Sequence, residues 1–390
     1  MKLVFYTNFL NHHQVMVADE LFKLLGNEFA FVATMPVDES LLKGGSDYST
    51  KRDYCVRAYA SEQQQNYAML LVREAEVCVF GADALPYEIV RATEGKGLSF
   101  EICERWLKKG CLNLASPRLQ KWLLNYHRYF KKAGFYRLCA SAFCKDDDSK
   151  LSAYKGHSYK WGYFTKVERF DVEAPSDVST SNITPLMWCS RYLMWKHPEQ
   201  PILMAHNLKM RGYHFVLDIF GSGEYEEQAK KLAKELSVED MVKFRGTMPN
   251  EQLMREMKEH DIFLFTSDRN EGWGAVANES MANGCVLVAS DAIGSVPYLV
   301  KDGVNGLMFK SASTKTSFGN PDQKALDDLT EKVAWLLDNK EKMKEMQRAA
   351  FLTMYNTWSP KRAAQNLLQL IDDLQNGRGT SIKEGPCSKA

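Results

Sequence analysis

Residues 261–309 read DIFLFTSDRNEGWGAVANESMANGCVLVASDAIGSVPYLVKDGVNGLMF, and this stretch decides the fold of the chain. Its apolar start predicts a buried strand over residues 261–267, and the apolar run over residues 285–290 predicts a second strand. Between them, a loop leads into a helix predicted over residues 275–283. A strand–loop–helix–strand unit with two apolar strands is typical of a parallel α/β sheet.

The loop and the helix carry two glutamates, Glu271 and Glu279, with seven residues between them. Gly272 and Gly274 let the backbone approach a ligand closely, and the start of a helix offers free N–H groups to an anion. A carboxylate is also a good acceptor for paired sugar hydroxyls. Either glutamate alone is compatible with a solvated surface position, but the Gly-x-Gly between them favours a ligand site.

The same alternation of short apolar runs and longer amphipathic runs extends over most of the chain. In the first half it predicts strands over residues 2–7, 29–34, 77–81, 98–103 and 136–141, and helices over residues 13–25, 62–74 and 85–92. In the second half it predicts further strands over residues 186–190, 215–220 and 242–245. Helices are predicted there over residues 198–210, 224–236, 250–258, 325–338, 341–355 and 360–374.

Residues 171–184 separate the two halves, because they are rich in Asp, Pro, Ser and Thr and have almost no apolar side chain after Val178. A linker is therefore predicted there, between α/β domains over residues 1–170 and 185–358. A helix over residues 359–375 and a disordered tail over residues 376–390 complete the predicted organisation. Ligands bind outside the carboxyl ends of parallel strands, so two such domains suit two substrates.

The composition excludes several classes of protein. The chain has 50 Lys+Arg against 49 Asp+Glu, a net charge of +1, which argues against a surface built for nucleic acid. No run approaches the ~18 apolar residues of a membrane span, and the apolar residues that follow Lys2 are too few for a secretory signal. The nine cysteines form no C-x-x-C pair and no zinc spacing, so we expect reduced thiols in a cytoplasmic protein.

The segment 261–309 resembles the signature of the retaining glycosyltransferases of family 4, which have the GT-B architecture. That signature is E-G-[FW]-G, a second Glu after seven residues and a late D-G-x-N-G; this chain has EGWG at 271–274, Glu279 and DGVNG at 302–306. The similarity extends over residues 186–357, through Ser190-Arg191 with Lys196, Gly221-Ser222-Gly223 and Phe244-Arg245-Gly246. The resemblance implies two Rossmann-like domains facing across a cleft, with a C-terminal helix that crosses back to the first domain.

The resemblance also implies the roles of the two domains. The second would bind a nucleotide-diphosphate sugar, and the first would bind the acceptor, a glycan or a lipid-linked sugar. Arg191 and Lys196 would stabilise the leaving diphosphate and Glu271 would hold the transferred sugar, which makes these three the predicted catalytic residues. Predicted donor-binding residues are Gly221, Gly223, Gly246, Gly272, Trp273, Gly274 and Glu279, the last of them on the ribose.

By the same resemblance, the reaction retains the anomeric configuration and serves polysaccharide or glycolipid biosynthesis. No side chain is assigned as a nucleophile. Neither a metal nor another cofactor is expected, because Arg191 and Lys196 take the place of a cation on the diphosphate. The acidic run Asp146-Asp147-Asp148 is accordingly interpreted as a solvated loop.

The first domain departs from the family pattern. Where many relatives have a glycine pair after the first strand, this chain has His12 and His13, which we expect to face the cleft. The family's histidine at a later strand end is missing, and Glu104 and Arg105 are the candidates to occupy its place. All four are predicted acceptor or cleft residues.

Residues 105–132 contain eight Lys and Arg and no Asp or Glu. Five apolar and aromatic residues share a helical stripe among them: Leu119, Trp122, Leu123, Tyr126 and Phe130. Such a segment suits peripheral binding to an anionic membrane surface, at the inner face of the membrane. The alternative is that the stripe belongs to the core and the charges form a solvated face. Nucleic acid is not expected as a partner.

Two other functions compete with a transferase. One is a sugar-nucleotide epimerase of the same architecture, whose relatives lack the E-G-[FW]-G to Glu arrangement. The other is a non-catalytic sugar-nucleotide-binding protein that has kept the pocket. The presence of Arg191, Lys196, Glu271 and Glu279 together favours the transferase.

Overall fold

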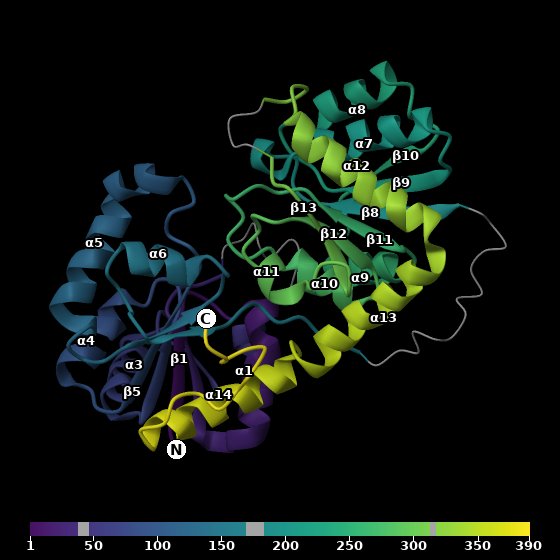
Figure 1. Cartoon of the computed structure of the whole chain (residues 1–390). Coiled ribbons are helices and arrows are strands. Elements are labelled where there is room, and N and C mark those ends of the chain that lie inside the picture. The colour runs from purple at the N-terminus through teal and green to yellow at the C-terminus, as the bar shows by residue number, and fades with distance from the viewer. Residues whose placement is uncertain (38–46, 169–182, 313–316) are drawn as a thin grey trace. The chain divides into compact units, whose positions relative to one another are not determined.

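The computed structural model describes residues 1–37, 47–168, 183–312 and 317–390. The chain divides into two compact units. The first unit consists of Met1–Thr165 and Thr357–Ala390, and the second unit consists of Lys166–Asn356 (Figure 1). Each unit is an α/β domain built on its own parallel sheet.

The first unit contains a seven-stranded sheet in the order β3-β2-β1-β4-β5-β6-β7. All of its strand pairs are parallel. The strands are β1 (Leu3–Thr7), β2 (Phe29–Ala33), β3 (Cys55–Arg57), β4 (Val77–Phe80), β5 (Leu98–Cys103), β6 (Tyr136–Cys139) and β7 (Ser158–Lys160). The chain reverses direction across the sheet between β1 and β4, which is the switch point of a doubly wound fold.

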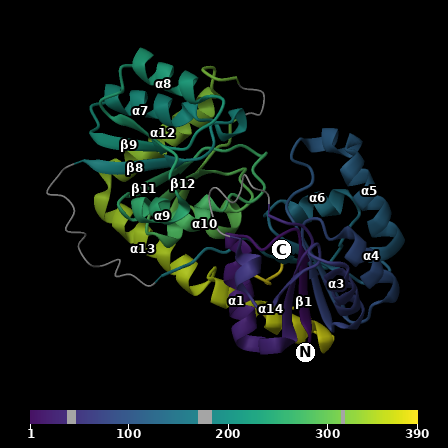
Figure 2. The same cartoon turned by 180° about the vertical axis from the view of Figure 1, so that it is seen from behind.

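Helices cover both faces of this sheet (Figures 1 and 2). They are α1 (His12–Leu25), α3 (Glu62–Glu74), α4 (Leu85–Glu94), α5 (Pro117–Asn125), α6 (Cys144–Lys150) and α14 (Pro360–Gln375), and a short π-helical turn over Tyr126–Phe130 extends α5. Side chains cap the N-termini of several of these helices. At the start of α1, the Asn11 amide oxygen accepts from the N–H groups of His13 and Gln14. Ser359 caps α14, whose first residue is Pro360.

The aromatic stripe of residues 105–132 belongs to the core of the first unit. Leu119, Trp122, Tyr126 and Phe130 are buried against apolar residues of the sheet and of α3 and α4, whereas Leu123 is partly buried. Of the two interpretations of this stripe, the core is the one that the structure supports, because these side chains are covered by their own domain.

The second unit contains a six-stranded sheet in the order β10-β9-β8-β11-β12-β13, again all parallel. The strands are β8 (Thr184–Cys189), β9 (Phe215–Phe220), β10 (Val242–Gly246), β11 (Ile262–Phe265), β12 (Val286–Ser290) and β13 (Gly306–Phe309). In chain order this is 3-2-1-4-5-6, the order of a dinucleotide-binding sheet. The switch point lies between β8 and β11.

Seven helices accompany this sheet in the described part of the unit: α7 (Glu199–Met210), α8 (Glu226–Glu235), α9 (Asn250–Lys258), α10 (Val276–Ala282), α11 (Val296–Leu299), α12 (Gln323–Asp338) and α13 (Lys340–Asn356). Helices α7, α8 and α12 cover one face, and α9, α10 and α13 lie on the other (Figures 1 and 2). On the first face, Trp188, Leu264 and Val288 pack against α7 and α12.

Most predicted strands and helices are found within a few residues of their expected bounds, and the predicted doubly wound α/β fold is confirmed. The predicted linker, residues 171–184, lies largely outside the described residues. The predicted helix over residues 359–375 is α14, which belongs to the first unit and packs against α1, as a helix that crosses back should.

The prediction of a disordered tail over residues 376–390 is wrong. The backbone of the tail pairs with the edge strand β7: Cys387 N–H donates to Lys160 O at 2.7 Å, and Lys160 N–H donates to Ser388 O at 2.8 Å. Cys387 is fully buried. An edge strand offers unpaired N–H and C=O groups, so the tail is held by β7 despite its polar composition.

None of the nine cysteines forms a disulfide. Within the described ranges, no helix combines the length and the apolar composition that crossing a bilayer requires.

Candidate functional site

Two loops of the second unit lie at the switch point of its sheet. One follows β8 and carries Arg191 and Lys196, and the other follows β11 and carries Glu271. Because β8 and β11 are neighbours and their connections leave in opposite directions, this edge of the sheet is where such folds bind ligands. The three residues predicted to be catalytic thus come from adjacent strand ends.

Lys196 and Glu271 form an ion pair, although 75 positions separate them in the sequence. Each side chain is only 11% exposed. The Lys196 ammonium also lies 4.1 Å from the centroid of the Trp195 ring. Burial lowers the pKa of Lys196 and the ion pair with Glu271 opposes this change. The pair therefore places one cation and one carboxylate, both largely shielded from water, at the end of the sheet.

Arg191 is exposed and adds a second positive charge beside this pair. Its proximity is evident in its effect on Lys196, whose pKa it lowers. Two neighbouring cations repel each other, which raises the free energy of the empty site. An anionic ligand such as a diphosphate would offset this repulsion.

Backbone and hydroxyl contacts join the two loops. The Thr266 hydroxyl donates to Lys196 O at 2.7 Å and accepts from the Trp188 indole N–H at 2.8 Å. The Asp268 N–H donates to Trp195 O at 3.0 Å. The turn that carries Lys196 and the loop that leads to Glu271 are therefore held as one hydrogen-bonded unit.

His197 completes this connection, and sequence reasoning missed it. It has a left-handed backbone, with φ of 50°, and is almost fully buried. Its Nδ1 lies 3.1 Å from Glu199 Oε1, and its Nε2 lies 3.5 Å from Asp268 Oδ2. Burial alone would lower the pKa of His197, but the two carboxylates raise it to about 9. No local pattern around His-Pro-Glu distinguishes such a residue, because Asp268 lies in the loop after β11, about 70 positions along the chain.

Glu279 lies in α10, whose residues from Ala277 to Ala282 are buried. Asn250 Nδ2 donates to Glu279 Oε1 at 3.5 Å, a weak contact that leaves the carboxylate available to a ligand. The charge of Glu279 also acts on the Cys189 thiol at the end of β8. Glu279 is thus close to the strand end that leads into the Arg191 loop.

Gly221 and Gly223 are required by close backbone packing. A Cβ on Gly221 would lie 1.9 Å from Ser190 O, and one on Gly223 would lie 2.8 Å from Tyr192 O. Both residues also have positive φ, at 127° and 153°. Their absent side chains let the loop after β9 lie directly on the loop that carries Arg191.

Gly246 differs, because a Cβ on it would meet no atom within 4 Å. Its φ of 70° still favours glycine, and its carbonyl accepts from Gly221 N–H at 2.8 Å. Gly246 therefore connects the ends of β9 and β10 and leaves open space beside its backbone.

The EGWG segment, residues 271–274, combines closely packed glycines with a buried tryptophan. Gly274 has φ of 82°, and a Cβ on it would lie 2.5 Å from Phe265 Cζ. Gly272 is buried. Trp273 was predicted to bind the donor, but its side chain is fully buried and its indole N–H donates to Asn278 Oδ1 at 2.8 Å. The Trp273 ring therefore fastens the loop to α10, and a contact of Trp273 with a donor would have to come from its backbone.

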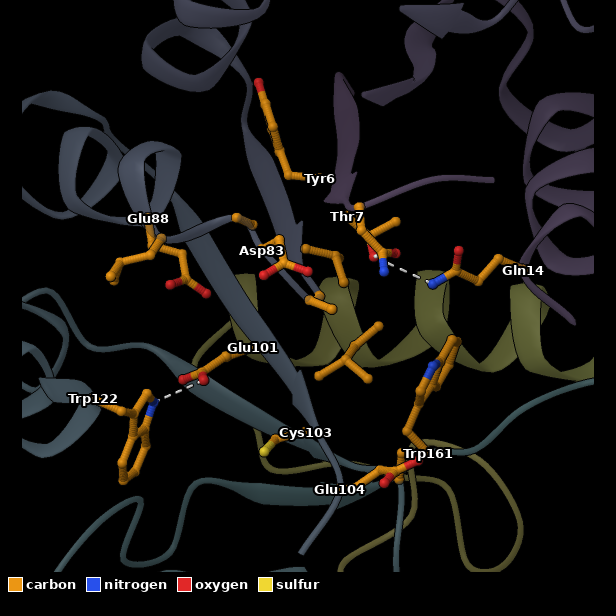
Figure 3. Close-up of a pocket in the computed structure, with 18 of the residues that line it drawn as sticks. Tyr6, Thr7, Gln14, Asp83, Glu88, Glu101, Cys103, Glu104, Trp122 and Trp161 are labelled. Atoms are coloured by element: carbon orange, nitrogen blue, oxygen red, sulfur yellow. Dashed lines mark hydrogen bonds between the residues drawn. The ribbon is translucent and has the colours of Figure 1, made fainter. Parts of the chain in front are cut away.

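The first unit has a pocket of its own, with a volume of about 940 Å³. It is lined by three of the four predicted acceptor residues, His13, Glu104 and Arg105, of which Figure 3 labels Glu104. His12 is exposed and does not line it, although its ring lies 3.7 Å from that of His13. Glu104 accepts from the Tyr163 hydroxyl at 2.8 Å and pairs with Lys108 at 3.0 Å.

Arg105 is less available than predicted. Its guanidinium forms an ion pair with Asp147 at 3.5 Å and lies 4.6 Å from the centroid of the Phe143 ring. The side chain is 7% exposed. Arg105 therefore supports the pocket wall, and the sequence could not show this because its partner is 42 positions away.

The acidic run 146–148 is not the solvated loop that was predicted. It lies in α6, where Asp147 and Asp148 are buried. Asp148 accepts two hydrogen bonds from Arg137, at 2.8 and 3.1 Å, and Asp147 accepts from Leu107 N–H at 2.8 Å. Asp148 supplies the counter-charge that buried Arg137 requires, whereas Asp147 pairs with Arg105.

Cys139, Cys144 and Asp148 bring three potential metal ligands within 4.8 Å of one another. Arg137 already occupies the Asp148 carboxylate. A hydrogen bond with Cys139, together with burial, raises the pKa of Cys144. Thiols that stay protonated are poor metal ligands, so this cluster is better suited to packing.

Residues 186–353 match the model of the family described as Glycosyl transferases group 1. The amylovoran biosynthesis glycosyltransferase of Erwinia amylovora is 36% identical over 104 residues, 25% of this chain and 25% of the relative. A D-inositol 3-phosphate glycosyltransferase of Corynebacterium aurimucosum is 34% identical over 108 residues, 28% of this chain and 25% of the relative. The match thus spans about a quarter of the length of these two relatives.

Solved structures match nearly the whole chain. A lipopolysaccharide outer core galactosyltransferase superposes with a TM-score of 0.67 at 14% identity, over 96% of this chain and 100% of that one. A glycosyltransferase of Rickettsia africae gives 0.66 at 12% identity, over 96% and 98%. Anabaena HepE, solved with UDP and glucose, gives 0.65 at 15% identity, over 96% and 100%. These identities show the fold alone, which is GT-B. The second unit thus matches the group 1 glycosyltransferase family over residues 186–353, and the whole chain shares its fold with these solved structures.

Proposed function

We propose that the chain transfers a sugar, with retention of anomeric configuration, from a nucleotide-diphosphate donor to a glycan or lipid-linked acceptor in polysaccharide or glycolipid biosynthesis. The observation that carries this proposal is the shielded Lys196–Glu271 pair with Arg191 beside it, at the switch point of the second unit. This arrangement offers both a cationic and a carboxylate partner to a sugar diphosphate.

Each residue has a distinct chemical task in this proposal. Arg191 and Lys196 stabilise the negative charge that grows on the diphosphate as the bond to the sugar breaks. Glu271 accepts hydrogen bonds from hydroxyls of the transferred sugar, and Glu279 accepts them from the ribose. The ion pair keeps Lys196 in place before the donor arrives, so little reorganisation is needed on binding.

The relatives support the choice of substrates. Anabaena HepE was solved with UDP and glucose, which favours a uridine nucleotide as the first donor to test. The Erwinia relative is named for amylovoran biosynthesis, and a Bacillus subtilis relative, 34% identical over 94 residues, is named a poly(glycerol-phosphate) alpha-glucosyltransferase. Both names favour a polymer or a phosphate-containing acceptor.

We further propose that the reaction needs no metal, because Arg191 and Lys196 supply the positive charge. Transfer that continues at an unchanged rate in excess EDTA would support this. Loss of the rate in EDTA, with recovery on adding Mg²⁺ or Mn²⁺, would contradict it.

We also propose contact with an anionic membrane surface, through residues other than the aromatic stripe. The stripe residues are in the core, but Leu112 and Leu124 are 79% and 71% exposed among the lysines and arginines of residues 105–132. Apolar side chains surrounded by cations suit the headgroup region of a membrane. We expect cosedimentation with anionic vesicles at low salt and its loss in Leu112→Asp/Leu124→Asp. Equal sedimentation with neutral vesicles would contradict the proposal.

The decisive test of the donor site is thermal stabilisation by nucleotides and nucleotide sugars. A ligand at 100 times its Kd stabilises by about 2.7 kcal/mol, which corresponds to a Tm shift of several degrees. We expect one nucleotide family to raise the Tm, and Lys196→Ala and Glu279→Ala to lose that response. Lys231→Ala, which alters an exposed lysine of α8, is the matched control.

Three further results separate the proposed function from its alternatives. Stabilisation without transfer to any acceptor favours a non-catalytic binding protein, and conversion of the free nucleotide sugar to an epimer favours an epimerase. The anomeric proton coupling of the product, followed by NMR from the start of the reaction, tests retention. Absence of stabilisation by every nucleotide at millimolar concentration would overturn the donor site.

A further inference from the structure

The pocket of the first unit lies at the carboxyl ends of β1, β4 and β5, which include the switch point of that sheet. Its lining includes Thr7 at the end of β1, Asn8 after it, Gly81 and Asp83 after β4, and Glu101 within β5. Figure 3 labels Thr7, Asp83 and Glu101. A volume of about 940 Å³ is within the range of small-molecule sites. All lining residues belong to the first unit.

Glu88 provides the first indication of a ligand. It projects from α4 and is only 5% exposed, and its carboxyl accepts no hydrogen bond from any described residue. Figure 3 shows this carboxyl on the same side of the pocket as Glu101. Burial, and then the charge of Glu101, raise the pKa of Glu88 well above its ordinary value. A carboxyl group that lines a pocket and has no hydrogen-bond partner in the protein is available to a ligand hydroxyl.

Glu101 is different, because it is already satisfied. Its oxygens accept from the Trp122 indole N–H at 2.8 Å and from the Tyr154 hydroxyl at 2.5 Å, and Arg137 lies 3.0 Å away. Of the two buried glutamates in this wall, Glu88 therefore has the free hydrogen-bonding capacity. The hydrogen bonds of Glu101 are used within the protein.

The lining also contains two cations. Arg118 and Lys121 of α5 line the pocket and are exposed, and neither forms an ion pair with another described residue. The preceding residue Ser116 also lines the pocket but does not cap α5 with its side chain, so N–H groups of the first turn are uncapped. Free cations beside a helix start suit a phosphate group.

The basic and acidic residues of the lining would contact different groups of a ligand. A phosphate beside Glu101 and Glu88 would face carboxyl groups and would find no unpaired cation. The phosphate end of the ligand is therefore expected at Arg118 and Lys121. A group with hydroxyls then reaches Glu88. A neutral sugar would leave the cations unused, and inorganic phosphate would leave Glu88 unsatisfied.

We propose that this pocket binds a phosphate ester of a polyhydroxyl compound, a sugar or polyol phosphate, with its phosphate on Arg118 and Lys121 and a hydroxyl on Glu88. The inference rests on the proposed function, in which this ligand is the acceptor or its terminal group. The same chemistry occurs in a soluble sugar phosphate and in a phospholipid that carries a polyol headgroup.

The test measures binding to the full-length chain by calorimetry, with glucose 1-phosphate, glycerol 3-phosphate, glucose and inorganic phosphate as soluble probes. Vesicles containing phosphatidylglycerol form the lipid arm, and phosphatidylserine vesicles control for charge without a polyol. Binding of either soluble ester, tighter than glucose or phosphate by about 10-fold or more, supports a soluble source. Preference for phosphatidylglycerol vesicles alone supports a lipid source.

Variants locate the ligand in the pocket. Arg118→Ala/Lys121→Ala is expected to weaken binding of the ester about 10-fold and to leave glucose binding unchanged, because only the phosphate contacts are lost. Glu88→Ala should also weaken binding about 10-fold, whereas Glu88→Gln should stay within about 3-fold, because an amide can still pair with a hydroxyl. Arg128→Ala removes an exposed cation outside the pocket and is the matched control.

Three results would overturn the proposal: equal affinity for glucose 1-phosphate and glucose, no effect of the double variant, or equal binding of phosphatidylglycerol and phosphatidylserine vesicles in the absence of soluble binding. The double variant alters exposed residues, so it remains informative if Glu88→Ala fails to fold. Nucleotide stabilisation through Lys196 and Glu279 is measured separately. If it persists while the ester does not bind, the donor site stands and only the pocket is misassigned.

Discussion

The Nε2 atom of His197 lies 3.5 Å from Asp268 Oδ2, which places a buried imidazole between the turn that carries Lys196 and the loop that carries Glu271. Glu199 holds the other ring nitrogen at 3.1 Å. The charged groups nearest to this imidazole are these two carboxylates, and the Lys196–Glu271 pair lies on the same two loops. A protonated His197 therefore helps to set the geometry of the candidate donor site.

His197 makes stability depend on pH in a defined direction. Its folded pKa of about 9 is above the ordinary value of 6.5, so its stabilisation is complete below pH 6.5 and is lost as pH rises through 9. A shift of this size corresponds to about 3 kcal/mol. We expect denaturant titrations to show a fall in unfolding free energy between pH 6.5 and 9 that His197→Gln reduces. An unchanged slope in the variant would show that other groups cause the fall.

Lys196 should matter more for turnover than for folding. Lys196→Met removes the charge opposite Glu271 and the positive charge for the leaving diphosphate. We expect kcat to fall by about 10²- to 10³-fold, as for the loss of one preorganised charge in an active site. Initial rates with the stabilising nucleotide sugar measure this, with Lys231→Met as control. A fall of less than 3-fold would remove Lys196 from the proposed machinery.

Substitution of Gly221 tests whether the loop after β9 must pack closely on the loop that carries Arg191. Gly221→Ala would place a methyl group 1.9 Å from Ser190 O, so the Arg191 loop must move. We expect a loss of about 2–4 kcal/mol in stability and weaker nucleotide binding. Gly246→Ala is the matched comparison, since its Cβ has open space and only its φ of 70° is unfavourable, a cost of about 1 kcal/mol. Equal effects of the two changes would contradict the packing argument.

The C-terminal tail should stabilise the first unit. Deletion of residues 378–390 removes the backbone pairs to β7 and uncovers the site of Cys387. We expect a Tm lower by several degrees and faster aggregation, because the exposed edge strand can pair with another chain. Light scattering during a thermal ramp measures both. A tail that was merely disordered would leave them unchanged.

Local sequence patterns predicted much of the fold. Apolar runs located β1, β2, β4, β8, β9 and β12, and amphipathic spacing located α3, α7, α9 and α14 within a few residues. The strands that were missed, β3, β7 and β13, have three or four residues each. Runs that short carry no readable period, and they form strands because a neighbouring strand supplies their hydrogen bonds.

Only some residues of the candidate sites could be predicted, because local patterns do not show which distant residues come into contact. Lys196 and Glu271 could be named because each follows an apolar strand at a spacing that resembles a known family. His197 and Arg137 could not be named, since their importance depends on partners that the fold brings from elsewhere in the chain. Glu88 could not be named either, because its burial in a pocket wall depends on the tertiary structure. The buried position of the Trp273 ring could not be predicted, because a motif gives a residue's place in the chain but not the direction of its side chain.

The sequence by itself determined the order of strands and helices, the two α/β domains and the loops that carry the charged residues, because these follow from local periodicity and from spacing along the chain. Only the tertiary structure decided which charges are paired, which are buried and which remain free for a ligand. Burial and pairing depend on atoms tens of residues apart, as in Lys196 with Glu271 or the tail with β7, and no local pattern encodes those distances.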